Sequence, residues 1–151
     1  MSQIQPGQRA PDFELPDQNG APVRLSQFRA QSPVVLFFYP KDDTTGCTIE
    51  ACTFRDEMPR FDSLAAKVIG VSSDSSESHS RFAAKHGLPY TLLSDNGGKV
   101  KKMFGVKNTF AFIPGRVTFV IDRDGIVRHV FSSQTQFQKH IEEALRALTQ
   151  A

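Results

Sequence analysis

The sequence predicts an α/β fold with a mixed central sheet flanked by helices. Strand-like and helix-like segments alternate from residue 34 to residue 105, which is the pattern of parallel strands joined by helical crossovers. Two further strand-like segments joined by a tight turn follow at 117–131, and an amphipathic helical pattern then runs towards the end of the chain. Because a tight hairpin pairs antiparallel, the sheet should contain both strand orientations.

The chain opens with a predicted small N-terminal hairpin. Residues 6–25 alternate apolar and polar side chains around Asn19-Gly20, a dipeptide that strongly favours a two-residue hairpin turn. Ser26 can then cap a short helical turn, after which Ser32-Pro33 leads into the next segment.

The central strand is expected from Val34 to Tyr39. This run of β-branched and aromatic side chains has no polar interruption, which is typical of a strand buried on both faces. Pro40 ends the run, and residues 42–46 supply side chains that favour a turn and a helix N-cap. The first long helix should therefore begin directly after this turn.

That helix is expected from Cys47 to about Leu64, with Glu50 in its first turn and with Pro59 ending or kinking it partway. Cys47 would then lie at a helix N-terminus, just past the carboxyl end of a buried strand. The free N–H groups and aligned peptide dipoles at a helix start favour a thiolate over a thiol. Cys47 is accordingly a candidate nucleophile, and the alternative is a small buried cysteine with a packing role.

The remaining elements follow from the same two hydrophobic periodicities. The turn at Asp122–Gly125 joins the last two strands, and Gly87 should end the second helix. The predicted strands cover residues 67–73, 89–94, 117–121 and 126–131, and the predicted helices cover residues 77–86, 96–105 and a C-terminal stretch that Ser133 and Gln136 open as a capping box.

Length and charge point to one domain, residues 1–151, with a small uncharged substrate. The 18 basic and 16 acidic side chains give a formal charge of +2 with no basic stripe or acidic tail, so neither nucleic acid nor a membrane surface is indicated as a partner. No apolar run is long enough to span a membrane, and the first residues do not resemble a secretory signal. A cytoplasmic location is expected.

The cysteine pattern favours redox chemistry over a metal site. Both cysteines, Cys47 and Cys52, lie five positions apart, and such a pair in a reducing compartment is more often catalytic or metal-binding than a structural disulfide. The four histidines have no spacing that would complete a zinc site with this one pair. We therefore expect no metal ligands.

Within this stretch, Pro40-x-x-x-Thr44-x-x-Cys47 resembles the motif of the peroxiredoxins, thiol peroxidases built on a thioredoxin-like fold. With Cys52 five positions on, the chain is similar to the branch called peroxiredoxin Q or bacterioferritin comigratory protein. Thr45 stands where that branch usually has proline. The similarity covers nearly the whole chain, through the segments Val68–Asp74, Leu88–Asp95, Gly115–Phe119 and Lys139–Ile141.

The resemblance implies a role for each of five residues. Cys47 attacks the peroxide and becomes a sulfenic acid, and Cys52 resolves this acid as a disulfide. Thr44 hydrogen-bonds the peroxide and the thiolate, Pro40 shields the sulfur from water, and Arg116 supplies a fixed positive charge. A lone arginine after Pro-Gly is usually a solvated loop residue, so the resemblance alone singles out Arg116.

The expected function is a thioredoxin-dependent peroxidase that acts on hydrogen peroxide and organic hydroperoxides without a metal or organic cofactor. Its partners would be peroxides and thioredoxin or a similar dithiol, and the branch favours a monomer. Two alternatives stay open: a dithiol–disulfide oxidoreductase, although that class typically uses Cys-x-x-Cys, and a non-enzymatic redox sensor. Glu50 could orient the site or simply complement the helix N-terminus.

Overall fold

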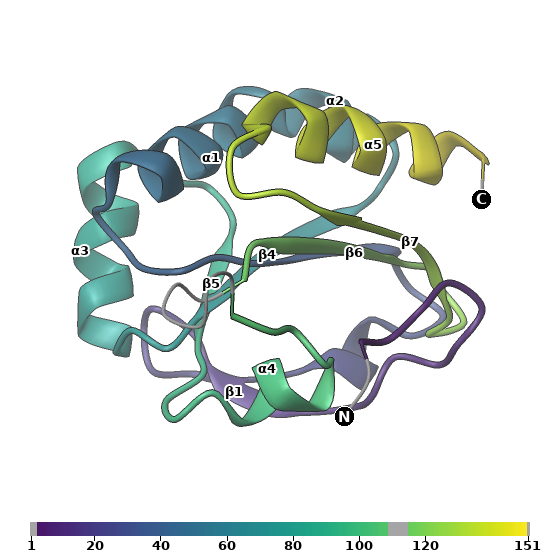
Figure 1. Ribbon diagram of the computed structural model, residues 1–151, viewed down its shortest axis with the longest axis horizontal. Coiled ribbons are helices and arrows are strands. Elements are labelled where there is room, and N and C mark those ends of the chain that lie inside the picture. Colours follow the sequence, from purple (N-terminus) through teal and green to yellow (C-terminus); the bar gives the residue numbers. More distant parts are fainter. Residues whose placement is uncertain (1–2, 109–114, 151) are drawn as a thin grey trace.

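The computed structural model describes residues 3–108 and 115–150 and is built on a five-stranded sheet in the order β5-β4-β3-β6-β7 (Figure 1). Strands β3, β4 and β5 are parallel, β6 pairs antiparallel with β3, and β7 pairs antiparallel with β6. The predicted mixed sheet is thus confirmed. The strands are β3 (Val34–Phe38), β4 (Lys67–Ser72), β5 (Thr91–Ser94), β6 (Val117–Ile121) and β7 (Val127–Ser132).

The other elements also match the predicted order. The N-terminal hairpin is confirmed as an antiparallel pair of β1 (Glu14–Pro16) and β2 (Pro22–Arg24), which a short 3-10 helix η1 (Leu25–Phe28) follows. None of the helices in the described part of the chain has the length and apolarity needed to cross a membrane. The helices are α1 (Thr45–Asp56), α2 (Met58–Ser63), α3 (Ser76–His86), α4 (Lys99–Met103) and α5 (Phe137–Gln150).

Two boundaries in the first long helix differ from the prediction. The helix breaks at Glu57, because Pro59, which lacks an amide proton, is accommodated in the first turn of a separate helix α2. Its start is Thr45, with Thr44 as N-cap, so Glu50 lies beyond the first turn rather than within it. Cys47 remains close to the helix N-terminus, at the third helical position.

The sheet carries an apolar core on each face. Helices α1, α2 and α5 cover one face, and the N-terminal hairpin and α4 lie towards the other (Figure 1). Side chains alternate along a strand, so Val35 and Phe37 of β3 enter the first core while Leu36 and Phe38 enter the second. Because both faces of β3 are covered, the uninterrupted apolar run in its sequence is explained.

A stack of two aromatic rings packs α1 against the sheet. The rings of Phe37 and Phe54 lie 4.4 Å apart and nearly parallel, which sets the distance of α1 from β3. Gly70, the neighbour of Phe37 in β4, leaves room for the ring, because a Cβ at this position would lie 2.7 Å from it. The start of α1, and Cys47 with it, is therefore held close to the end of β3.

The antiparallel pairing of β3 with β6 brings a distant residue to the same place. Phe38, the last residue of β3, pairs with Val117, the first residue of β6. Arg116 directly precedes Val117, so it lies beside the carboxyl end of β3 where the loop towards α1 begins. This register brings Arg116 close to Cys47, although the two residues are 69 positions apart in sequence.

Candidate active site

Cys47 is a buried thiol surrounded by hydrogen-bond donors. Its side chain is 1% exposed, and its Sγ accepts hydrogen bonds from the backbone N–H of Lys41 at 3.5 Å and from Arg116 Nη2 at 3.3 Å. The first turn of α1 adds the positive end of the helix dipole. All three features interact favourably with negative charge on the sulfur.

Arg116 links the sulfur to a buried carboxylate. Its Nη1 donates to Glu50 Oε1 at 2.7 Å, its guanidinium carbon lies 5.0 Å from the centre of the Phe137 ring, and the residue is only 4% exposed. Burial lowers the pKa of Arg116, but the negative charges of Glu50 and Cys47 outweigh this and raise it above its ordinary value. The guanidinium is therefore a permanent positive charge.

Glu50 is completely buried, and only one of its oxygens is hydrogen-bonded. Oε1 accepts from Arg116, whereas Oε2 has no hydrogen-bond partner and lies 3.8 Å from His140 Nδ1. Burial raises the pKa of Glu50 to about 7, and the charge of Arg116 and its hydrogen bond only partly offset this. Glu50 can thus change its charge near neutral pH.

His140, a neutral imidazole, lies next to Glu50 at the end of this buried chain of contacts. Its Nε2 donates to the carbonyl oxygen of Ser133 at 2.8 Å, and the Thr118 hydroxyl therefore donates to Nδ1, also at 2.8 Å. Burial, together with the positive charge of Arg116, lowers the pKa of His140 to about 4 against the opposing effect of the bond to Ser133. This contact could not be read from the sequence, because the packing of α5 on β6 creates it.

The loop before α1 holds two more of the predicted residues, Thr44 and Pro40. Thr44 is exposed, and its hydroxyl donates to the carbonyl oxygen of Lys41 at 2.9 Å, so its oxygen lone pairs remain available as acceptors. Pro40 is half-buried and lines a hollow of about 380 Å³ at the carboxyl ends of β3, β4 and β5. Cys47 is not among the described residues that line this hollow.

Cys52 lies apart from this group. It is half-buried, carries a free thiol and belongs to the same helix α1 as Cys47. The structure thus places Arg116 against the Cys47 sulfur and Glu50 against Arg116, while Thr44 and Pro40 lie in the loop before α1. The backbone N–H of Lys41 was missed by the sequence reasoning, since no side-chain pattern reports where a backbone amide points.

Comparison with known proteins identifies the family. The family profile described as AhpC/TSA matches residues 6–130. The chain belongs to the AhpC/TSA family. Relatives that match nearly its whole length are chloroplastic peroxiredoxin Q proteins, and those from Arabidopsis thaliana and Sedum lineare are 50% and 49% identical, covering 100% and 98% of this chain and 70% and 80% of theirs.

Solved structures agree with this assignment. Peroxidoxin BcpB from Mycobacterium tuberculosis superposes with a TM-score of 0.90 at 43% identity over 97% of both chains. A Cys-to-Ser mutant of PrxQ from Xylella fastidiosa superposes with a TM-score of 0.89 at 30% identity over 99% of this chain and 98% of that one. The predicted thioredoxin-like fold and membership of the peroxiredoxin Q branch are confirmed.

The function that the sequence indicated is also supported at the level of the family. The protein is a thiol peroxidase with redox-active cysteines, and reduction by a thioredoxin-type partner is typical of the family. The comparisons do not favour the redox-sensor or the dithiol–disulfide oxidoreductase alternative.

The expected cytoplasmic location is wrong by the same comparison. Several curated relatives with nearly full coverage of this chain are chloroplastic proteins, which points to a plastid. The reason for the error is physical: the folded domain carries the chemistry, and neither its composition nor the absence of a secretory pattern encodes a compartment.

The buried position of Glu50 predicts a pH-dependent stability. Its pKa is about 7 in the folded protein against 4.5 when it is not buried, so folding favours the protonated form. The contribution of Glu50 to the free energy of unfolding should be constant below pH 4.5. It should then fall by up to about 3 kcal/mol as the pH rises to 7. Urea unfolding of reduced wild type and Glu50→Gln at a series of pH values measures it.

The difference in the free energy of unfolding between wild type and Glu50→Gln should therefore change between pH 4.5 and 7 and level off above pH 7. Glu142→Gln, at an exposed position of α5, is the matched control and should follow the wild-type profile. A pH-independent difference between wild type and Glu50→Gln would contradict the assignment.

Proposed function

We propose that Cys47 is the nucleophile of this peroxidase and that Arg116, Thr44 and Pro40 complete its site. The observation that carries the proposal is the buried Cys47 sulfur held 3.3 Å from the guanidinium of Arg116, at the start of a helix. A charged group fixed beside the reacting sulfur stabilises negative charge without having to reorganise during the reaction.

In the first step, the Cys47 thiolate attacks one oxygen of the peroxide. An S–O bond forms, the O–O bond breaks, and the second oxygen leaves with the electron pair as hydroxide or alkoxide and takes up a proton. Arg116 is placed to stabilise the charge that moves from sulfur to oxygen. The Thr44 hydroxyl donates its hydrogen bond to the carbonyl oxygen of Lys41, so its oxygen can accept a hydrogen bond from the peroxide O–H.

Pro40 differs from the residues around it because its backbone nitrogen carries no proton. It lies between Tyr39, the first residue after β3, and Lys41, whose amide bonds the sulfur. Its ring can therefore shield this side of the sulfur from water without competing for the hydrogen bond. The substrates that fit such a site are hydrogen peroxide and small organic hydroperoxides.

In the second step, Cys52 resolves the sulfenic acid. Its thiolate attacks the Cys47 sulfur, an S–S bond forms, the S–O bond breaks, and the oxygen leaves as hydroxide, which takes up a proton to become water. A dithiol protein of the thioredoxin type then reduces the disulfide, which returns both thiols and leaves the disulfide on the partner.

The second step needs a change of shape, because both cysteines lie on α1. At a rise of 1.5 Å and a turn of 100° per residue, Cα atoms five positions apart are about 8.6 Å from each other and about 140° around the axis. A disulfide needs Cα atoms within about 6.8 Å and converging Cβ vectors. The start of α1 must therefore unwind before Cys47 and Cys52 can bond.

We further propose that residues 1–151 form one domain that works as a monomer. Both apolar cores pack on the same five-stranded sheet, and Cys52 lies in the same chain and helix as Cys47, so no second copy is needed to supply the resolving thiol. Light scattering should give the mass of one chain for the reduced and the oxidised protein, and a dimer mass for either form would contradict the proposal.

The two cysteine variants should separate the two roles. Cys47→Ser should abolish peroxide reduction, because the nucleophile is gone, whereas Cys52→Ser should reduce about one equivalent of peroxide and then stall. Mass spectrometry of peroxide-treated Cys52→Ser protein should find added oxygen on Cys47, first as the sulfenic and then as the sulfinic acid. Unmodified Cys47 in that sample, alongside normal turnover by wild type, would overturn the assignment.

Amide hydrogen exchange tests the unwinding of α1. Protection of residues 46–54 should fall sharply when the disulfide forms, while the strand at 34–38 stays protected. Peroxide-treated Cys52→Ser protein, which cannot form the disulfide, is the control and should keep its helix protected. Equal protection of residues 46–54 in reduced and oxidised wild type would rule out the unwinding.

A further inference from the structure

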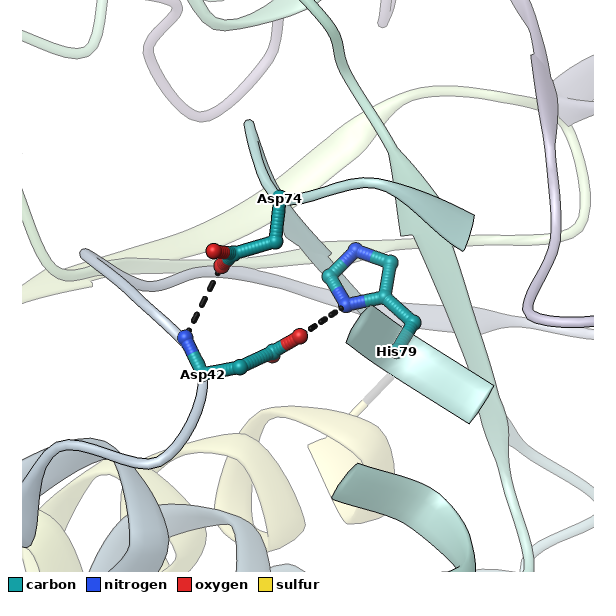
Figure 2. Close-up of side chains that lie close together, drawn as sticks. All are labelled: Asp42, Asp74 and His79. Atoms are coloured by element: carbon teal, nitrogen blue, oxygen red, sulfur yellow. Dashed lines mark hydrogen bonds and ion pairs between the residues drawn. The ribbon is translucent and has the colours of Figure 1, made fainter. Parts of the chain in front are cut away.

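A second buried polar group lies behind the active-site loop. Asp42 and His79 are 5% and 0% exposed, and His79 Nδ1 lies 2.7 Å from Asp42 Oδ2. Figure 2 shows the imidazole of α3 pointing at this carboxylate, while the carboxylate of Asp74, in the turn after β4, accepts the backbone N–H of Asp42 at 2.8 Å. None of these three side chains contacts the Cys47 sulfur or has a place in the reaction described above.

The hydrogen bonds join these side chains into one connected unit. His79 Nε2 faces the carbonyl oxygen of Leu93 at 2.9 Å, and a carbonyl oxygen only accepts, so Nε2 carries a proton and donates. His79 Nδ1 lies 2.7 Å from Asp42 Oδ2 and 3.3 Å from the Tyr39 hydroxyl. Both ring nitrogens therefore have hydrogen-bond partners, which fix the orientation of the imidazole.

Both oxygens of the Asp42 carboxylate have hydrogen-bond partners. Besides the contact with His79, the carboxylate accepts from the hydroxyl of Tyr39 at 2.6 Å and from that of Ser78 at 2.8 Å. Burial and the negative charge of Asp42 raise the pKa of Tyr39 well above its ordinary value, so its hydroxyl remains a donor. Partners from α3 and from the residue after β3 thus hold this carboxylate in one orientation.

The spacing of Asp42, Asp74 and His79 would also suit a metal ion, since one ligating atom from each lies within 4.8 Å of the others. A metal ligand, however, needs a free lone pair on an imidazole nitrogen, whereas Nε2 of His79 donates to the Leu93 carbonyl oxygen and Nδ1 already lies against Asp42 and the Tyr39 hydroxyl. The arrangement therefore fits an anchor better than a metal site.

The anchored residue lies in the loop that completes the active site. Asp42 directly follows Lys41, whose N–H bonds the Cys47 sulfur and whose carbonyl oxygen accepts from Thr44. The next residue, Asp43, has a φ of 61°, a left-handed conformation that non-glycine residues rarely adopt unless their surroundings hold them in it. A small shift of Asp42 would therefore move both groups that face the sulfur and the peroxide.

We propose that Asp42 and His79 are positioning residues that fix the loop at 40–44 for peroxide attack. The pair connects this loop to α3 and, through Leu93, to β5, and neither element belongs to the helix that must unwind for disulfide formation. The loop thus keeps its place through the catalytic cycle, and α1 refolds against it. This proposal rests on Cys47 being the nucleophile.

The test measures the two half-reactions separately in full-length protein. Asp42→Asn and His79→Gln should each lower the second-order rate constant of reduced protein with hydrogen peroxide by about 10- to 100-fold, the scale for a misplaced catalytic group. The rate at which thioredoxin reduces the Cys47–Cys52 disulfide should change less than about threefold, because α1 is open in that step. A merely destabilised protein would not show this selectivity for one step.

Because the pair acts as one unit, the double variant should be no slower with peroxide than the slower single variant. Asp95→Asn is the matched control: this carboxylate is 2% exposed and caps α4 by accepting from the backbone N–H groups of Val100 and Lys101, and its rate with peroxide should stay within about threefold of wild type. Cys47→Ser abolishes the reaction altogether, which distinguishes failure of the proposed nucleophile from failure of the anchor.

Ser78→Ala removes one donor from the Asp42 carboxylate without leaving a charge unpaired, so it tests the anchor even where the other variants do not fold. It should slow peroxide attack severalfold with a wild-type circular dichroism spectrum. Wild-type rates in all folded variants, additive effects in the double variant, or equal losses in both half-reactions would overturn the proposal. So would a loss of wild-type activity on treatment with EDTA that zinc restores.

Discussion

A buried guanidinium holds the two halves of the active site together. Arg116 comes from the start of β6 and donates at once to Cys47 and Glu50 on α1, within a region that is almost closed to water. A buried positive charge is costly unless it is paired. Glu50 supplies that pairing, and a thiolate at Cys47 adds to it. Fold stability and reactivity therefore depend on the same contact.

The proposed site needs both rigid elements and a helix, α1, whose start can unwind. The β3–β6 pairing and the Phe37–Phe54 stack fix the sulfur against the guanidinium for peroxide attack. Cys52 is on the same helix and cannot reach the sulfur while that helix is intact. Holding the 40–44 loop from α3 and β5 lets α1 unwind and refold without losing the rest of the site.

The order of elements could be predicted because hydrophobic periodicity reports burial directly: the apolar run at Val34–Phe38 is a strand covered on both faces. The motif from Pro40 to Cys47 likewise located the turn before α1 that we propose to be reactive. The pairing of Glu50 with Arg116 and the contact with His140 could not be predicted, because they depend on the register of β6 and the packing of α5. The helix boundary at Glu57 was missed because Pro59 is compatible with the first turn of a new helix as well as with a kink.

The most direct test of this account is the rate of peroxide attack on reduced Arg116→Ala protein. If the guanidinium stabilises the charge that moves from sulfur to oxygen, the second-order rate constant with hydrogen peroxide should fall by about 100-fold or more. Arg128→Ala, which removes an exposed guanidinium from β7, should react at the wild-type rate. A folded Arg116→Ala protein that reacts with peroxide as fast as wild type would contradict the account.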